Sequence, residues 1–117
     1  MSDKDNRYYY YVILSSEDGK IFHLTHGYQL PNGLAINRNY YGDKFIITDV
    51  KTGTKVHDKN FDSQKEALAE VQSEQFQKLL KEARENPSYE RRVEILKEHI
   101  NSIPVEDRCP GWKRYFK

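Results

Sequence analysis

The feature that most constrains the fold is a change of hydrophobic pattern near residue 60. Before this point, short runs of aromatic and β-branched residues are separated by turns rich in Gly, Pro, Asn and Asp, whereas apolar residues recur at helical spacing after it. Strands in one half of a chain and helices in the other indicate an α+β domain and argue against an alternating fold with a parallel sheet. We therefore expect an N-terminal antiparallel sheet or small β-barrel of five to six strands, followed by two helices.

The first half of the chain predicts five strands, at residues 8–14, 21–25, 34–36, 45–50 and 54–57. The last two form the clearest hairpin, because β-branched runs flank a turn that contains Gly53. The segment 27–33, with two Gly and one Pro, is predicted to be a loop. A sixth strand is expected at 112–116, where it would pair beside the first strand and close a barrel or cover an open edge.

The helical half has clear start and stop signals. Ser63 and Glu66 form a capping box, in which the Ser hydroxyl accepts the Glu66 N–H while the Glu carboxylate reaches back to the Ser63 N–H. A single amphipathic helix is predicted from there to Asn86, where Pro87 breaks the pattern. Pro87 suits the first turn of a second helix, which is predicted to end near Ser102.

A chain of 117 residues can bury one core but has no room for two domains of ordinary size. We expect a single domain over 1–117, with a β-rich part at 8–58, a helical part at 63–102 and a C-terminal tail or strand at 103–117. Nine tyrosines argue against disorder, since disordered chains are poor in aromatic residues. The chain lacks a membrane-spanning run and a signal-peptide pattern, and it has one cysteine, so we expect a cytoplasmic protein without a membrane partner.

Metal-binding and catalytic patterns are weak. His23 and His26 lie three apart, and on a strand this spacing places them on opposite faces, so they are poorly placed for chelation. Cys109 lies in no nucleophile motif and is expected to be a packed thiol. Phosphate-binding motifs such as GxxxxGK[ST] and GxGxxG are missing from the sequence. We therefore expect no enzyme, no catalytic residue, no metal site and no cofactor.

Aromatic and basic residues occur together near both ends of the sequence. Single-stranded nucleic acids are bound in this way, with rings stacking on bases and cations holding phosphates. The total charge of +1, from 19 basic and 18 acidic residues, means that such binding must come from local clusters, and residues 108–117 contain four cations and no acid. The predicted phosphate contacts are Arg7, Lys113, Arg114 and Lys117, and the predicted stacking residues are Tyr9, Tyr11, Trp112 and Tyr115.

We accordingly predict a noncatalytic nucleic-acid-binding regulatory protein, with RNA preferred over DNA as the partner. The alternative is a protein interaction module or homodimeric adaptor that binds no nucleic acid. In that case the tyrosines of 8–11 would cover core or a dimer interface, where Tyr and Trp are enriched. The Leu and Phe face of the first predicted helix is a second candidate for such an interface.

Two local resemblances point to mobile genetic elements. Residues 30–36 (LPNGLAI) and 45–56 (FIITDVKTGTKV) resemble the PrgU-like group of small plasmid-borne proteins of Gram-positive bacteria, over roughly residues 28–57. This resemblance implies a small PUA-like β-barrel with helices and a regulatory RNA- or DNA-binding role in pheromone-responsive conjugation. Residues 49–71 are similar to the strand-turn-strand-helix of the DNA-binding arm domains of tyrosine integrases, although the catalytic integrase domain is missing. A plasmid or phage origin is therefore expected.

Overall fold

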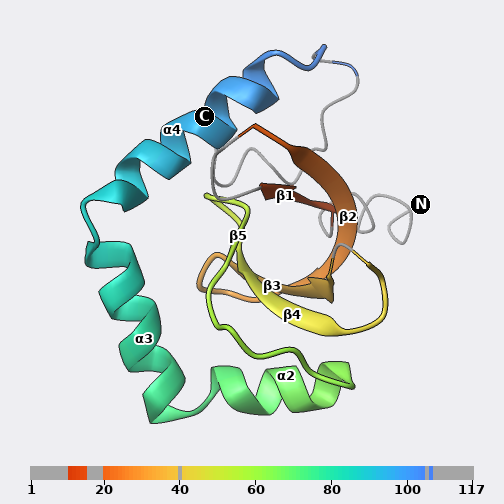
Figure 1. Cartoon of the computed structure of the whole chain (residues 1–117), viewed down its shortest axis with the longest axis vertical. Coiled ribbons are helices and arrows are strands. Elements are labelled where there is room, and N and C mark those ends of the chain that lie inside the picture. Colours follow the sequence, from red (N-terminus) through yellow and green to blue (C-terminus); the bar gives the residue numbers. More distant parts are fainter. Residues whose placement is uncertain (1–10, 16–19, 40, 105, 107–117) are drawn as a thin grey trace.

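The structure is a computed structural model that describes residues 11–15, 20–39, 41–104 and 106. An antiparallel sheet is followed by three helices (Figure 1), which confirms the α+β class. The strands are β1 (Tyr11–Ser15), β2 (Phe22–Gln29), β3 (Leu34–Arg38), β4 (Phe45–Asp49) and β5 (Thr54–Lys55), and the helices are α2 (Gln64–Val71), α3 (Glu74–Glu85) and α4 (Ser88–Asn101). Within the described ranges, every helix is too short or too polar to cross a bilayer.

The sheet has the strand order β1-β2-β3-β4-β5, with each strand antiparallel to the next. It curves into an open arch (Figure 1), and among the described strands β1 and β5 do not pair to close a barrel. The reason is that β5 has only two residues, which is too short for a full ladder with β1. The two edges approach where the Ser15 N–H donates to the Gly53 carbonyl over 2.8 Å. The predicted strand at 112–116 lies outside the described residues.

Strand β2 is longer than predicted, because residues expected to form a loop continue the pairing. Gly27, Tyr28 and Gln29 lie opposite Asn37, Ile36 and Ala35 of β3. Backbone hydrogen bonds to a neighbouring strand satisfy the polar groups of the segment, and this outweighs the turn preference of its glycine. The loop between β2 and β3 is therefore shorter than the predicted 27–33.

The first predicted helix is in fact two helices, so the expectation of two helices was wrong. The hydroxyl of Ser73 accepts the Phe76 N–H over 3.1 Å and donates to the Glu70 carbonyl over 2.8 Å, so it ends α2 and caps α3. The Gln77 amide donates to the Val71 carbonyl over 2.7 Å, which satisfies a further carbonyl at the end of α2. The break allows the two segments to turn their apolar faces toward the core separately.

One of the two hydrogen bonds in the predicted capping box of α2 is confirmed. The Glu66 N–H donates to the Ser63 hydroxyl over 3.1 Å, as expected for an N-cap. The Glu66 carboxylate, however, accepts from the Asp62 N–H over 3.1 Å, and not from Ser63. The carboxylate still satisfies an N–H just before the helix, one residue earlier than the capping box predicts.

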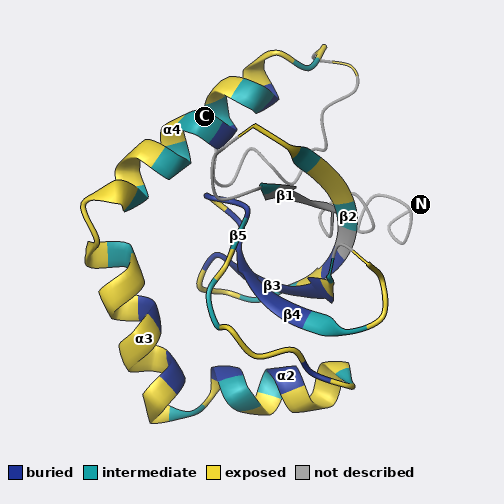
Figure 2. Ribbon diagram, viewed as in Figure 1, coloured by how far each residue is buried: buried dark blue, intermediate teal, exposed yellow. Residues whose placement is uncertain are grey.

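The main core lies between the middle strands and the first two helices, where Figure 2 shows buried residues in dark blue. Its buried members are Leu34, Ile36, Ile47, Phe61, Ala67, Val71, Phe76 and Leu80. Full burial of one large apolar side chain stabilises the fold by about 1.5–3 kcal/mol. Phe76 and Leu80 are 1% and 5% exposed, so this part of the predicted Leu and Phe face is core and cannot serve as an interface.

The last helix reaches back to β2. Leu96 and Ile100 of α4 are buried, and the ring of His99 stacks on Phe22 with a centroid distance of 3.9 Å and an interplanar angle of 7°. Burial lowers the pKa of His99 below 6.5. The ring is therefore held in its neutral form, in which it packs as an aromatic group.

We predict that the free energy of unfolding decreases when the pH is lowered, because of His99. Since the folded-state pKa is lowered, the stabilisation is fully present above the unfolded value of 6.5 and is lost as the pH falls through the lowered pKa. Urea denaturation at about pH 7.5 and about pH 5.5 should show a smaller decrease for His99→Phe than for the unmodified protein. His23→Phe, at an exposed position of β2, is the control and should keep the full decrease. An equal decrease in all three proteins would contradict the assignment.

Candidate nucleic-acid interface

Most of the residues predicted from the sequence to bind nucleic acid lie outside the described residues. These are Arg7, Tyr9, Trp112, Lys113, Arg114, Tyr115 and Lys117. Tyr11 is the first residue of β1, and its Cα lies opposite that of His26 in β2. His26 in turn lies between Thr25 and Gly27, which line an open hollow on the sheet. Tyr11 is therefore the one predicted binding residue that the structure describes, and it belongs to the strand that pairs with β2.

The hollow, which we call the β2–β3 groove, has a volume of about 550 Å³. Its lining comes from β2, β3, the start of β4 and the start of α2, namely Thr25, Gly27, Tyr28, Ile36, Asn37, Arg38, Phe45 and Gln64. This lining contains one cation, Arg38, and no acidic side chain. It combines two aromatic rings, a guanidinium group and neutral polar groups.

The strand register explains why the groove forms here. Tyr28 lies opposite Ile36, and Arg38 lies opposite Phe45, so the alternation of side chains places all four on one face of the sheet. Ile36 belongs to the core beneath α2. Because α2 begins only at Gln64, which itself lines the groove, the other three side chains lie at the margin of the covered area.

The guanidinium group of Arg38 lies over an aromatic ring. Its guanidinium carbon lies 4.7 Å from the ring centroid of Phe45, a cation–π contact. Its Nη1 also donates to the Gly42 carbonyl over 3.3 Å. Arg38 is exposed and Tyr28 is 46% exposed, so solvent reaches both side chains.

The loop after β3 fixes the second contact of Arg38. The Asn39 carboxamide oxygen accepts the N–H groups of Gly42 and Asp43 over 2.8 and 3.2 Å. Gly42 has φ +78°, a conformation that L side chains rarely adopt. Tyr41, in the same loop, is 85% exposed. The loop thus orders its own backbone and carries the exposed Tyr41 three residues after Arg38 in the sequence.

A buried amide forms part of the groove lining but uses its hydrogen bonds within the fold. Asn37 is 1% exposed, its Nδ2 donates to the Arg38 carbonyl over 2.8 Å, and its Oδ1 accepts the Thr48 hydroxyl over 2.7 Å. Groups satisfied in this way stabilise a unique arrangement of the strands. We therefore assign Asn37 a structural role.

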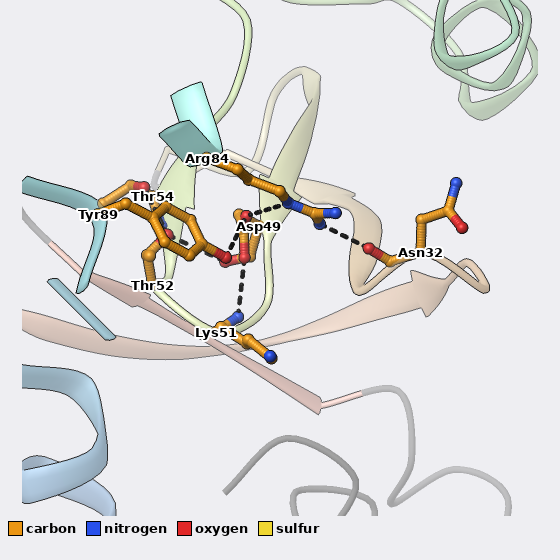
Figure 3. A network of polar contacts seen from close by, with 7 residues as sticks. All are labelled: Asn32, Asp49, Lys51, Thr52, Thr54, Arg84 and Tyr89. Atoms are coloured by element: carbon orange, nitrogen blue, oxygen red, sulfur yellow. Dashed lines mark hydrogen bonds and ion pairs between the residues drawn. The ribbon is translucent and has the colours of Figure 1, made fainter. Parts of the chain in front are cut away.

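A second polar cluster surrounds the buried carboxylate of Asp49 (Figure 3). This side chain is 4% exposed; its Oδ2 accepts from Arg84 Nε over 3.2 Å and from the Tyr89 hydroxyl over 2.9 Å, and its Oδ1 accepts the Lys51 N–H over 3.0 Å. Arg84 also donates to the Asn32 carbonyl over 2.5 Å. Burial and the Asp49 charge raise the pKa of Tyr89, so its hydroxyl remains a donor. The cluster fastens α3 and α4 to the sheet.

Two further hollows that are lined by described residues have a different character. One of about 520 Å³ is lined by Asp62, Glu66 and Glu70 with Lys59 as its cation, so it repels a polyanion. One of about 120 Å³ beside Asp49 is too small for a nucleotide. Of the three, the β2–β3 groove has the charge and the aromatic content that suit a nucleic acid.

Two further histidines, His57 and His99, pack against aromatic rings. His57 Nδ1 accepts the Lys59 N–H over 3.0 Å, and its ring centroid lies 6.2 Å from that of Phe76. His99 stacks on Phe22. In the part of the chain that the structure describes, no three His, Cys, Asp or Glu side chains are grouped to hold a metal ion. Cys109 lies outside that part.

Sequence reasoning missed Tyr28, Arg38 and Phe45 as site residues. Tyr28 lies in the segment 27–33, whose Gly and Pro residues predict a loop, and a loop has no strand alternation that would indicate which way its side chain faces. Arg38 follows the apolar run 34–36 by two residues and therefore shares the face of Ile36. The face that Arg38 shares with Ile36 was the signal available in the sequence. Whether that face is covered or exposed at Arg38 depends on where α2 begins.

The Asp49 cluster predicts a loss of stability for Tyr89→Phe. This change removes one donor to a buried carboxylate and keeps the ring, so the free energy of unfolding should fall by about 1.5–3 kcal/mol, the range for a hydrogen bond to a charged group. Urea denaturation measures the change. Tyr41→Phe is the matched control at an exposed position and should change stability by less than about 0.5 kcal/mol. Equal effects of the two changes would refute the fastening role.

The Arg38 loop predicts a conformational cost for Gly42→Ala. An added Cβ would meet no atom within 4 Å, so the expected loss of about 1 kcal/mol comes from the positive φ alone. Gly42→Asn should lose less, because Asn tolerates this conformation better. The two variants are compared by thermal denaturation, and an equal loss in both would count against a purely conformational cause.

Comparison with known proteins provides no relative from which a function could be inferred. No family model, curated protein or solved structure matches the chain. The chemistry of the β2–β3 groove is therefore the starting point of the proposal that follows.

Proposed function

We propose that this protein is a noncatalytic nucleic-acid-binding regulator that uses the β2–β3 groove as its contact surface, with RNA as its first partner and DNA as the second. The observation that supports this most directly is the Arg38 guanidinium, which lies over Phe45 in a groove that also contains Tyr28. Arginine planes and aromatic rings are the groups on which proteins stack nucleobases, and arginine also binds phosphate.

The distribution of charge supports the same surface. The whole chain carries only +1, so broad electrostatic attraction of a polyanion is weak. The groove lining carries one positive charge and no acid, whereas the acidic hollow at α2 has a lining charge of −2, from one lysine and three acids. A nucleic acid is therefore directed to the groove and away from the acidic hollow that is lined by Asp62, Glu66 and Glu70.

The position of β1 connects the groove with the residues predicted from the sequence. Tyr11 pairs opposite His26, between two groove residues of β2. Arg7 and Tyr9 precede Tyr11 by only a few residues, and together with the cluster at 112–117 they are proposed to extend the contact surface. The contribution of these residues to binding is proposed from their aromatic and basic side-chain types alone.

Fluorescence anisotropy with labelled single-stranded RNA and DNA tests the proposal. Saturable binding is expected at about 50 mM salt, and it should weaken as salt rises, with a shallow slope because few phosphates are neutralised. Arg38→Gln should weaken binding about five- to tenfold, or about 1–1.4 kcal/mol, which is the net value of one hydrogen-bonded contact at a solvent-exposed position.

Arg91→Gln is the matched control for that experiment. Arg91 is an exposed residue of α4, so the change removes the same charge away from the groove. It should leave the affinity within about twofold, because a distant exposed charge is largely screened by salt. A lack of saturable binding to either nucleic acid would refute the proposal, and equal losses for both variants would refute the groove as its location.

A protein interaction module or homodimer is the second candidate, and exposed apolar side chains at β2 favour it. Ile21, just before the strand, is 62% exposed, and Leu24 within it is 50% exposed. Side chains of this kind are typical of contact surfaces when they form larger patches. Light scattering over a range of protein concentrations distinguishes this candidate, since a strict monomer that binds nucleic acid would leave it without support.

A further inference from the structure

We infer that the β2–β3 groove binds an unpaired nucleobase by stacking, so that the ligand class is single-stranded nucleic acid and not a duplex. This inference rests on the proposed function and specifies the ligand of the same site. It follows from three properties of the groove: its aromatic and guanidinium surfaces, its unused polar groups and its size.

The stacking surfaces are arranged for a base whose faces are accessible. In a duplex, each base is covered above and below by its neighbours, and a protein reaches only the groove edges and the phosphates. The Arg38 plane over Phe45 and the ring of Tyr28 offer flat apolar or cationic faces, which are useful only to a ligand with a free π face. Duplex DNA or RNA could use the charge of Arg38 but not these surfaces.

Arg38 has hydrogen-bonding capacity left for the edge of a base or its phosphate. A guanidinium group carries five N–H donors, and its one hydrogen bond to another described residue is the bond to the Gly42 carbonyl. That bond and the Phe45 contact fix the orientation of the plane before a ligand arrives. A side chain ordered in advance loses less entropy on binding, which raises the affinity obtained from each contact.

One neutral side chain can bond the polar edge of the base or its sugar. Gln64 at the start of α2 lines the groove, and its side chain makes no hydrogen bond to another described residue. The carboxamide provides both donors and an acceptor. It can therefore pair with any of the bases, so we expect little sequence preference.

The size of the groove fits one or two nucleotides. Its volume of about 550 Å³ lies within the range of pockets that enclose small ligands. It is open to solvent at Tyr28 and Arg38, which are both exposed, so a strand can enter and leave on either side of the bound base. The groove therefore suits one segment of a longer single strand.

Tyr28 provides the test of stacking. A single-stranded oligonucleotide is compared with the same strand annealed to its complement, and with a version in which one base is replaced by the fluorescent analogue 2-aminopurine. We expect the single strand to bind at least about tenfold more tightly than the duplex, and the 2-aminopurine fluorescence to be quenched on binding. Tyr28→Ser should weaken single-strand binding about 5- to 100-fold, whereas Tyr28→Phe should leave it within about twofold.

Thermal denaturation of both variants checks that they fold, and Tyr28 is sufficiently exposed for either replacement. Equal affinity for single strand and duplex, with no effect of Tyr28→Ser, would overturn the stacking site while leaving nucleic-acid binding in place. Equal losses for Tyr28→Ser and Tyr28→Phe would also overturn it, since the hydroxyl and not the ring would then be needed. If neither form of nucleic acid binds at low salt, the proposed function itself fails.

Discussion

The buried carboxylate of Asp49 is the interaction on which the arrangement of the helices depends. A charge removed from water is costly unless charged and hydrogen-bonding partners surround it, and here the partners come from α3 and α4. Arg84 and Tyr89 lie on either side of the helix break at Asn86, so both must meet one carboxylate at the end of β4. This requirement places the junction of α3 and α4 over the β4–β5 hairpin and sends α4 back toward β2, where His99 meets Phe22.

The β2–β3 groove forms because the two strands reach farther than the helix that covers them. β2 and β3 extend beyond the area that α2 covers, because α2 starts only after the segment that pairs Phe61 with Phe45. The side chains on the covered part become core, and those beyond it become a solvent-accessible aromatic and cationic surface. The same strand alternation therefore generates both the stability of the sheet and the candidate binding surface, and the boundary between them is the first residue of α2.

Features with local causes could be predicted from the sequence. The Ser63 cap, the turn at Gly53 and the helix break at Asn86 and Pro87 all depend on neighbouring residues, and all three are confirmed. The break at Ser73 could not be predicted, because a serine within a helical pattern is compatible with a continuous helix and only packing against the sheet selects the cap. The groove was missed for a similar reason, since its residues come together through strand register. The clusters at 7–11 and 112–117 stay predictions.

The edge contact between Ser15 and Gly53 gives the sheet a particular mechanical property. Among the described residues, the first strand meets the β4–β5 turn through this one backbone hydrogen bond, while each pair of neighbouring strands is joined by its own ladder. A single such bond contributes only about 0.5–1.5 kcal/mol. The arch can therefore widen where β1 meets the β4–β5 turn without separating any pair of neighbouring described strands.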